Sequence, residues 1–212
     1  MRRPTEAEII SSFLKACQHV ERRGLLQCSS GNMSWRLDST RMLVSRTRSW
    51  LCQLTPEDVA ICAIADGSSL NGVPPTVEVR FHAGILRKRP EVNVVLHYQA
   101  PFSTTLACRE QLGIDYNVIP ELPFYIGPIG HVPFLMPGTE VLADAVIAEM
   151  TTHELAQMSN HGQVVVAPDF PQALERAEFF ELACRIIVMS GSYVEPIPPR
   201  FVKELSGQGK RI

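Results

Sequence analysis

The sequence predicts a single α/β domain built in three layers. Helix-like and short strand-like segments follow one another, with few of the long strand–helix alternations that build a parallel sheet. The 212 residues, 45% of them hydrophobic and 20% charged, are enough for one sizeable core. No linker or internal repeat divides them. We therefore expect one domain over residues 1–192, and over residues 193–212 a tail that is either an arm on a neighbouring surface or frayed.

The helices are predicted from apolar periodicity and capping residues. The first, from Thr5 to Gly24, has Thr5 and Glu8 as a capping box and apolar residues at helical spacing. The last long helix, from about Pro171 to Met189, begins with a proline, which suits a first helical turn. Further helical segments are expected at residues 76–88, 102–110 and 139–150.

Short apolar runs bounded by turn residues predict the strands. The expected strands lie at residues 33–37, 42–45, 59–64, 92–97, 154–158 and 163–167. The last two are joined by the turn SNHG, so that they are expected to lie side by side.

Composition excludes several classes of function. The net charge of −2 and the scattered basic residues argue against partners such as nucleic acid or an anionic membrane. The first residues form no apolar leader, and no apolar run approaches the length of a bilayer span, so we expect a cytoplasmic protein. The six cysteines form no CxxC pair, which argues against both a disulfide framework and a structural zinc knuckle.

A candidate metal site begins in residues 94–101, VVLHYQAP, where His97 ends an apolar strand. An isolated histidine of this kind is more often structural than a ligand. His161 adds a second imidazole in a turn where Gly162 permits an unusual backbone, and three protein ligands with an open position are typical of catalytic zinc. Gln99 would project beside His97, because side chains alternate along a strand, but its amide carbonyl is a poorer zinc ligand than imidazole.

Three further features have both a structural and a functional interpretation. Glu78, expected just after a helix cap at Thr76, is either a helix-start carboxylate or a general base or metal ligand. The loop SSGN at residues 29–32 is either an ordinary turn or an anion-binding nest. The segment SRTRS at residues 45–49 is either a solvated basic loop or a grip on phosphate or carboxylate.

Five ordered motifs resemble the class II aldolase/adducin family, and within it the L-fuculose-phosphate aldolases most. The motifs are SSGNMSWR, LVSRTRSWLCQLTPEDV, PTVEVRFH, RPEVNVVLHYQAP and NHGQVVVA, spread over roughly residues 5–190. The resemblance implies a three-layer α/β/α fold around a central, mainly antiparallel sheet. It also implies a homotetramer with active sites at subunit interfaces, each holding a zinc ion on three histidines.

The resemblance assigns roles at the metal site. His97 and His161 match the first and third zinc ligands, and Gln99 stands where the second histidine belongs. Glu78 matches the catalytic acid/base. We expect a divalent metal, most simply zinc, held by His97, His161 and either Gln99 or Glu78.

The resemblance also indicates substrate-binding positions, with two departures. Arg48 replaces a glycine beside the phosphate, and Val77 replaces a phosphate-binding serine, so that the pocket suits either phosphate or a carboxylate. The proton-donor tyrosine of a neighbouring subunit has no clean match; Tyr125 is the candidate, and Tyr116 lies in the same region. The positions expected to hold the phosphate are Ser29, Ser30, Gly31, Asn32, Thr47, Arg48 and Thr76.

The activity implied is retro-aldol cleavage of a ketose phosphate such as L-fuculose 1-phosphate, giving dihydroxyacetone phosphate and a small aldehyde. The metal would act as a Lewis acid and Glu78 would move the proton. Three alternatives stay open. They are a pentulose-phosphate 4-epimerase of the same family, a non-catalytic adducin-like interaction module whose metal site has decayed at Gln99, and a metal-free domain with structural histidines.

Overall fold

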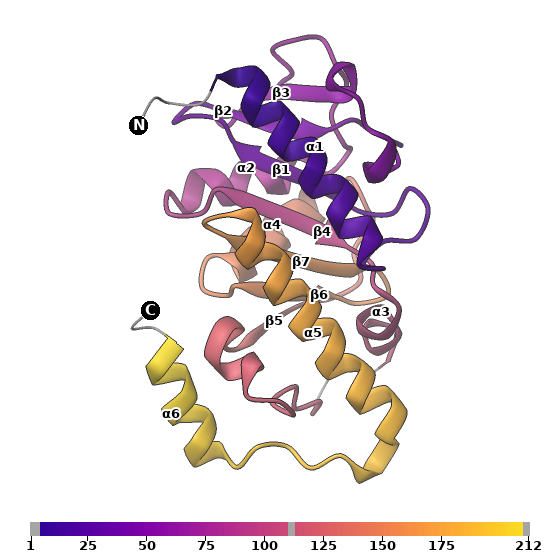
Figure 1. The fold of residues 1–212 in the computed structure, drawn as a ribbon, viewed down its shortest axis with the longest axis vertical. Coiled ribbons are helices and arrows are strands. Elements are labelled where there is room, and N and C mark those ends of the chain that lie inside the picture. Colours follow the sequence, from indigo (N-terminus) through magenta and orange to yellow (C-terminus); the bar gives the residue numbers. More distant parts are fainter. Residues whose placement is uncertain (1–4, 110–112, 210–212) are drawn as a thin grey trace.

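The computed structural model describes residues 5–109 and 113–209 (Figure 1). Within these residues seven strands form one sheet in the order β3-β2-β1-β4-β7-β6-β5. Every neighbouring pair is antiparallel except β5 and β6, which are parallel, so the predicted mainly antiparallel sheet is confirmed. The strands are β1 (Asn32–Arg36), β2 (Arg41–Ser45), β3 (Val59–Ala63), β4 (Val94–Tyr98), β5 (Ile129–Val132), β6 (Leu155–Met158) and β7 (Gly162–Ala167).

Helices cover both faces of the sheet and complete the three predicted layers. On one face lie α1 (Glu6–Arg22) and α5 (Phe170–Ser190), with α3 (Pro101–Ala107) packed against α5 (Figure 1). On the other face α2 (Val79–Lys88) and α4 (Glu140–Met150) pack against each other. The α/β/α architecture expected from the sequence is therefore present.

Successive side chains of β4 point to opposite faces of the sheet, which contributes to both cores and sets the direction of His97. Val94, Leu96 and Tyr98 face the core formed with α1 and α5, whereas Val95 faces the core of α2 and α4. The ring of His97 also lies on the α2 side, edge-on to Phe81 with 6.2 Å between the ring centroids. All five residues of β4 are buried, so His97 is delivered by a strand that is covered on both faces.

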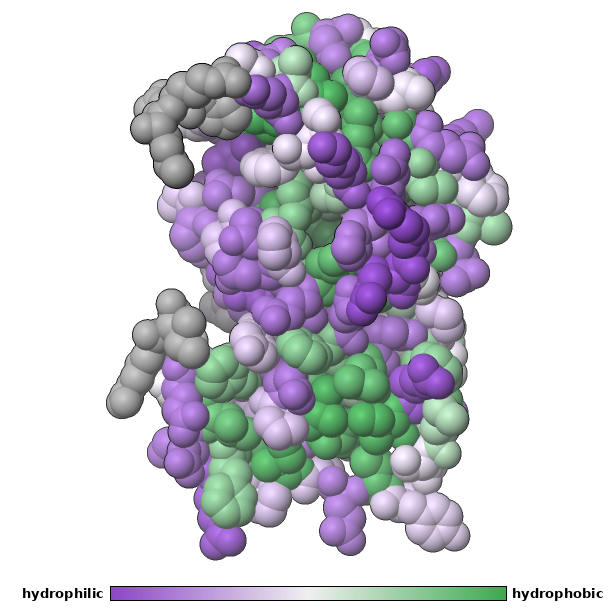
Figure 2. Space-filling model, in the orientation of Figure 1, coloured by the Kyte–Doolittle hydropathy of each residue, from purple (hydrophilic) through white to green (hydrophobic). Residues whose placement is uncertain are grey.

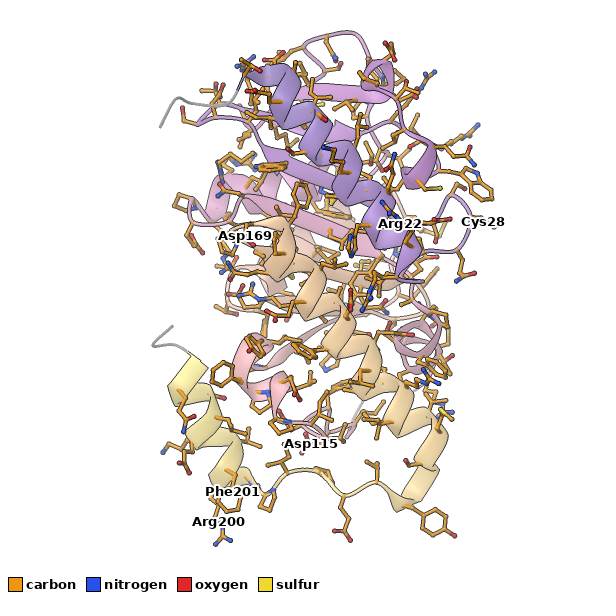
Figure 3. The ribbon with its side chains drawn as sticks, viewed as in Figure 1. Arg22, Cys28, Asp115, Asp169, Arg200 and Phe201 are labelled. Carbon is orange, nitrogen blue, oxygen red and sulfur yellow. The ribbon has the colours of Figure 1, made fainter. Side chains whose placement is uncertain are left out.

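Helix starts follow the capping chemistry of the sequence. The hydroxyl of Thr5 accepts a hydrogen bond from the Glu8 backbone, and the Glu8 carboxylate accepts one from the Thr5 backbone, as the capping box predicts. A carboxylate oxygen of Asp169, labelled in Figure 3, accepts from the backbone N–H of Gln172 and caps α5.

The start of α2 corrects one prediction. The helix begins at Val79 rather than at residue 76, and its N-cap residue is Glu78, not Thr76. The Thr76 hydroxyl instead accepts a hydrogen bond from the backbone N–H of Glu78 at 3.4 Å, in a turn that precedes the helix. Glu78 is therefore held just ahead of the first helical turn, with its side chain free to bind elsewhere.

The π-helical turn η3 (Leu122–Ile126), the edge strand β5 and the helix α6 (Pro199–Gly209) were not expected from the sequence, and neither were the short 3-10 turns. The tail therefore contains a helix, and α6 packs against η3. Arg200 and Phe201 mark its first turn in Figure 3, with the guanidinium 4.6 Å from the ring centroid. Figure 2 shows apolar side chains gathered on the lower half of the visible face, over η3 and α5.

Three short 3-10 turns complete the connections: η1 (Leu51–Gln53), η2 (Pro56–Asp58) and η4 (Gly191–Tyr193). Among the described residues, no helix combines the length and the apolar character that a bilayer crossing requires.

Candidate metal centre and active site

The candidate site forms where several chain ends meet at one edge of the sheet. His97 lies near the end of β4 and is paired in register with Asn32, the first residue of β1. On the other side of β4, the strand β7 starts directly after His161. Antiparallel neighbours put the end of one strand beside the start of the next, so these side chains meet, and Glu78 joins them from the start of α2.

Three of the predicted residues form a group of possible metal ligands. Glu78, His97 and His161 present ligand atoms that all lie within 4.8 Å of one another. Nε2 of His97 is 3.6 Å from Oε2 of Glu78, and Nε2 of His161 is 3.4 Å from Oε1 of Glu78. Two ligand atoms bound to one tetrahedral zinc stand about 3.3 Å apart. The spacing therefore suits a single shared ion.

The two imidazoles are oriented with Nε2 toward Glu78. Nδ1–H of His97 donates to the carbonyl oxygen of Gln163 at 2.9 Å, so Nε2 is the ring nitrogen that faces Glu78. Burial, with a smaller contribution from His97, lowers the pKa of His161 to about 4, although Glu78 acts in the opposite direction. His161 is therefore neutral near pH 7.

An unpartnered carboxylate oxygen tests whether these residues fit a metal. Glu78 is only 6% exposed, yet among the residues that the structure describes its Oε1 has no hydrogen-bond partner, and neither has the buried Nδ1 of His161. An ionised carboxylate buried without compensation is costly. A divalent ion shared with two neutral imidazoles would provide that compensation, and this donor set is one that zinc accepts. The residues present therefore fit a divalent metal ion.

The other carboxylate oxygen of Glu78 is engaged by Asn32. Nδ2 of Asn32 donates to Oε2 of Glu78 at 2.9 Å, and His82 approaches the carbonyl end of the same amide, with 2.5 Å between Nε2 and Oδ1. Asn32 was expected to hold phosphate; in this structure its amide contacts the candidate base. His82 was not expected at all. Its one sequence signal was its position four residues after Glu78, a spacing that puts a helical residue on the same side as the cap of its helix.

Gln99 lies beside the group, just past the end of β4. Its backbone N–H donates to the Leu25 carbonyl at 3.3 Å, and its side chain is half-buried. A Cβ added to Gly162 would be 2.7 Å from Cγ of Gln99 and 3.2 Å from Cε1 of His97, so both side chains crowd the same glycine. Metal binding by Gln99 itself stays a prediction.

Gly162 is required for close packing and not for an unusual backbone. In the turn between β6 and β7, the left-handed conformation is taken by Asn160, with φ of 53°. Asparagine tolerates this region better than most residues. Gly162 instead lets the Tyr98 carbonyl approach, since an added Cβ would lie 2.6 Å from that oxygen.

The loop before β1 contributes its residues unequally. Ser29 is exposed, and the Ser30 hydroxyl accepts a hydrogen bond from the Gln27 backbone at 3.0 Å, which closes the loop on itself. Gly31, with φ of 85°, packs so tightly that an added Cβ would be 2.7 Å from the His97 carbonyl oxygen. Asn32 is therefore the loop residue seen to contact Glu78.

The expected phosphate segment adjoins the turn that carries Glu78. Thr47 donates its backbone N–H to the Pro74 carbonyl, and Thr76 donates its own to the Ser45 carbonyl at 3.0 Å. Arg48 is exposed in a left-handed conformation, with φ of 57°. The segment lines a cavity of about 520 Å³ together with Trp50, Gln53, Leu54, Asp58 and Pro74. Phosphate binding here stays a prediction.

Neither predicted tyrosine belongs to the layer that His97 faces. The Tyr125 ring stacks on Phe179 of α5, with 5.4 Å between centroids. The Tyr116 hydroxyl accepts a hydrogen bond from Gln157 at 3.2 Å, and burial raises the pKa of this tyrosine. Both side chains lie on the α5 side of the sheet. A proton-donor role for Tyr125 stays a prediction that requires a neighbouring subunit.

Known proteins are similar to this chain over nearly its whole length. A 3-oxo-tetronate 4-phosphate decarboxylase from Haemophilus influenzae is 29% identical over 192 residues, which are 89% of this chain and 91% of that protein. An L-fuculose phosphate aldolase from Methanococcus vannielii is 28% identical over 183 residues, 85% of this chain and 97% of that one. Among solved structures, YgbL from Klebsiella pneumoniae superposes with a TM-score of 0.87 at 24% identity, covering 96% and 100% of the two chains.

The family model for the class II aldolase and adducin N-terminal domain matches residues 11–188. That range contains all seven strands of the sheet and each residue of the ligand group. This chain therefore belongs to the class II aldolase and adducin family.

Proposed function

We propose that this protein is a metal-dependent carbon–carbon lyase that decarboxylates a small 3-oxo sugar acid carrying a terminal phosphate. The observation that carries the proposal is the buried group of Glu78, His97 and His161, in which one carboxylate oxygen has no partner within the described part of the chain. The decarboxylases among the relatives support the substrate class, since one from Escherichia coli is 30% identical over 186 residues.

Decarboxylation and retro-aldol cleavage leave the same fragment. A 3-oxo four-carbon acid 4-phosphate loses C1 as CO₂, and a ketose 1-phosphate loses an aldehyde when C3–C4 breaks. In both cases the electron pair of the broken bond stays on the carbon beside the carbonyl, as the enediolate of dihydroxyacetone phosphate. A divalent ion, which we propose to be zinc, would supply Lewis acidity to the carbonyl and hydroxyl oxygens of the substrate.

Glu78 is placed to handle the proton of the reacting carbon. Its Oε2 accepts the Asn32 N–H, so Oε1 is the oxygen that can face substrate. The reaction ends when Glu78 passes a proton from solvent to the enediolate carbon, which gives dihydroxyacetone phosphate. The Gln163 carbonyl meanwhile keeps the His97 ring oriented through the reaction.

Decarboxylation also needs fewer groups than retro-aldol cleavage. CO₂ leaves without a proton transfer, whereas a departing aldehyde requires a base for its hydroxyl. The four tyrosines lie elsewhere within one subunit: Tyr98, Tyr116 and Tyr125 on the α5 side, and Tyr193 at 92% exposure in η4. Arg48 suits an acidic substrate, because its guanidinium could pair with a carboxylate or a phosphate.

The second candidate is retro-aldol cleavage of an L-fuculose 1-phosphate-like ketose. It is favoured by the aldolases among the relatives, including the 5-deoxy-D-ribulose 1-phosphate aldolase of Bacillus thuringiensis. In this candidate the protein is a homotetramer, and Tyr125 from a neighbouring subunit exchanges the proton of the hydroxyl group that becomes the aldehyde oxygen. The phosphate is held by Thr47, Arg48 and Thr76 in both candidates.

A substrate comparison on zinc-loaded protein tests the proposal. The substrates are 3-oxo-tetronate 4-phosphate, L-fuculose 1-phosphate and a pentulose 5-phosphate, with CO₂, dihydroxyacetone phosphate, free aldehyde and epimer each measured. Dihydroxyacetone phosphate released with CO₂ supports decarboxylation. The same product released with an aldehyde supports the aldolase and overturns the decarboxylase, and an epimer without fragments indicates a 4-epimerase.

Matched variants connect the activity to the site. Glu78→Gln keeps the shape of the side chain but removes the base, and should lower turnover by about 10²–10⁴-fold. His97→Ala and His161→Ala should lose the zinc that is retained by the native protein. An equal, negligible zinc content in the native protein and in both histidine variants, together with no product, would overturn the enzyme proposal in favour of a non-catalytic interaction module.

A further inference from the structure

A line of buried side chains runs from Glu78 into the space between β1 and α2. Asn32 donates to Glu78 at 2.9 Å, His82 Nε2 lies 2.5 Å from Asn32 Oδ1, and Ser34 Oγ lies 2.8 Å from His82 Nδ1. His82 and Ser34 are fully buried, and Asn32 is 7% exposed. The line therefore connects the candidate base to a fully enclosed polar pair.

Two regular spacings bring these residues together. Asn32 and Ser34 are two residues apart on β1, which separates them by roughly 6.7 Å along one face of the strand. His82 lies in the first turn of α2, four residues after the N-cap Glu78, and the helical rise puts the two about 6 Å apart along the axis. Because the two spacings nearly match, side chains from the helix end and from the strand alternate along the line, in the order Glu78, Asn32, His82, Ser34.

Each hydrogen bond in the line can have only one direction. Nδ2 of Asn32 donates to Oε2 of Glu78, so the carbonyl oxygen of the same amide is turned toward His82. That oxygen can only accept, so the proton of the His82 ring is on Nε2. Burial lowers the pKa of His82 to about 3, so the ring is neutral and its Nδ1 accepts from the Ser34 hydroxyl.

Packing alone does not account for a histidine at this position. His82 stacks on Phe81, with 4.6 Å between the ring centroids, and its helix is buried against an apolar core. An apolar residue would fill the space without the cost of burying two ring nitrogens. It would also leave the carbonyl oxygen of Asn32 without its partner, and the amide could then turn over and place that oxygen toward the carboxylate of Glu78.

We propose that His82 is a positioning residue that locks the Asn32 amide with its NH₂ toward Glu78, so that the opposite carboxylate oxygen faces the metal and the substrate. The inference rests on the proposed function, because it assigns His82 a purpose through Glu78. It predicts that the N–H at the Nε2 position, and not the ring itself, is the property the site requires.

Paired substitutions separate these two properties. In His82→Gln the side-chain NH₂ can take the place of Nε2–H, whereas in His82→Asn the amide reaches only the place of Nδ1. Ile85→Val, one turn further along α2 at a 1% exposed position, is a control for loosened packing. The dissociation constant of Co²⁺, from chelator competition, and its visible absorption spectrum report on the ligand group without requiring turnover.

We expect His82→Gln and Ile85→Val to bind Co²⁺ like the native protein, and His82→Asn to bind about 10–100-fold more weakly with an altered spectrum. Native affinity in His82→Asn, or an equal loss in His82→Gln, would overturn the inference. Nitrogen-15 spectra of the histidines in the metal-free native protein give a second test, which does not depend on any variant folding. A proton on Nε2 of His82 supports the inference, and one on Nδ1 overturns it.

The outcomes also distinguish this inference from the proposed function. A native protein that binds no Co²⁺ and releases no product refutes the lyase, while the nitrogen-15 spectra still decide the state of His82. A native lyase whose metal affinity is the same in all the His82 variants refutes the positioning role and leaves the lyase in place.

Discussion

Replacing Gly162 with alanine should push β4 and β7 apart and weaken metal binding at the candidate site while the fold is retained. An added Cβ would lie 2.6 Å from the carbonyl oxygen of Tyr98. An ordinary contact of 3.4 Å therefore requires that oxygen to retreat by about 0.8 Å (3.4 − 2.6). A backbone carbonyl cannot rotate away as a side chain can, since Tyr98 is paired in register with Gln163. The displacement must pass to the ends of both strands, where His97 and His161 are held.

The expected cost is modest in stability and larger in metal binding. Overpacking of this kind costs about 1–3 kcal/mol, and the reduced freedom of the unfolded chain offsets about 0.4–1 kcal/mol of it. The net loss of about 1–2 kcal/mol corresponds to a Tm lower by about 2–8 °C for a chain of this size. Urea unfolding of the metal-free protein should show a lower midpoint at unchanged slope. Co²⁺ affinity should fall by about tenfold or more, as it does when support for a metal ligand is disturbed.

Gly207→Ala provides the matched control. Gly207 lies in α6 and has open space where a Cβ would be added, so alanine there should leave stability unchanged or raise it by roughly 0.5–1 kcal/mol. A Gly162→Ala protein with native urea midpoint and native Co²⁺ affinity would refute the close approach on which the reasoning depends.

Three other predictions address Gln99, His82 and Arg48. Gln99→His should tighten zinc binding by at least about tenfold in chelator competition, because imidazole is the better zinc ligand; unchanged affinity would place this side chain outside the ligand set. His82 has a folded-state pKa of about 3, below its unfolded value near 6.5, so protonation favours unfolding. The free energy of unfolding of the metal-free protein should therefore fall as pH drops from about 6.5, by up to about 1.4 kcal/mol per pH unit from this group, and His82→Gln should lack that part of the slope in urea unfolding at pH 7 and 5. Arg48→Gly should raise stability by about 1 kcal/mol by relieving the left-handed conformation, yet raise KM for the phosphorylated 3-oxo acid; an unchanged KM would remove Arg48 from substrate binding.

Elements with strong local patterns were predictable, and those that depend on distant partners were not. A few consecutive residues are enough to predict β4, from its apolar run, and the start of α1, from its capping box. The strand β5 has only four residues, follows Gly127 and Pro128, and is stabilised by parallel pairing with β6 far along the chain. The helix α6 begins among prolines and has no buried residue, and its place depends on packing against η3, a partner that is distant in the sequence.

The candidate site divides in the same way. Residue types and the family resemblance indicated His97, His161 and Glu78, but only the sheet topology brings them within 4.8 Å of one another. His82 was not predicted because a histidine on the buried face of an amphipathic helix does not by itself indicate a functional residue. Its meaning depends on Asn32, which the antiparallel pairing of β1 and β4 places opposite His97.

In the proposed mechanism, a glutamine at position 99 instead of an imidazole gives Glu78 two tasks. With Gln99 as a weak ligand or none, Glu78 would complete the ligand group in the resting protein and would also serve as the base. A carboxylate that alternates between these tasks needs one oxygen compensated throughout, or its burial becomes costly each time it leaves the ion. The Asn32 amide provides that constant partner at Oε2. The support of Asn32 by His82 should therefore matter more in the native protein than in the Gln99→His variant, where a third imidazole would hold the ion.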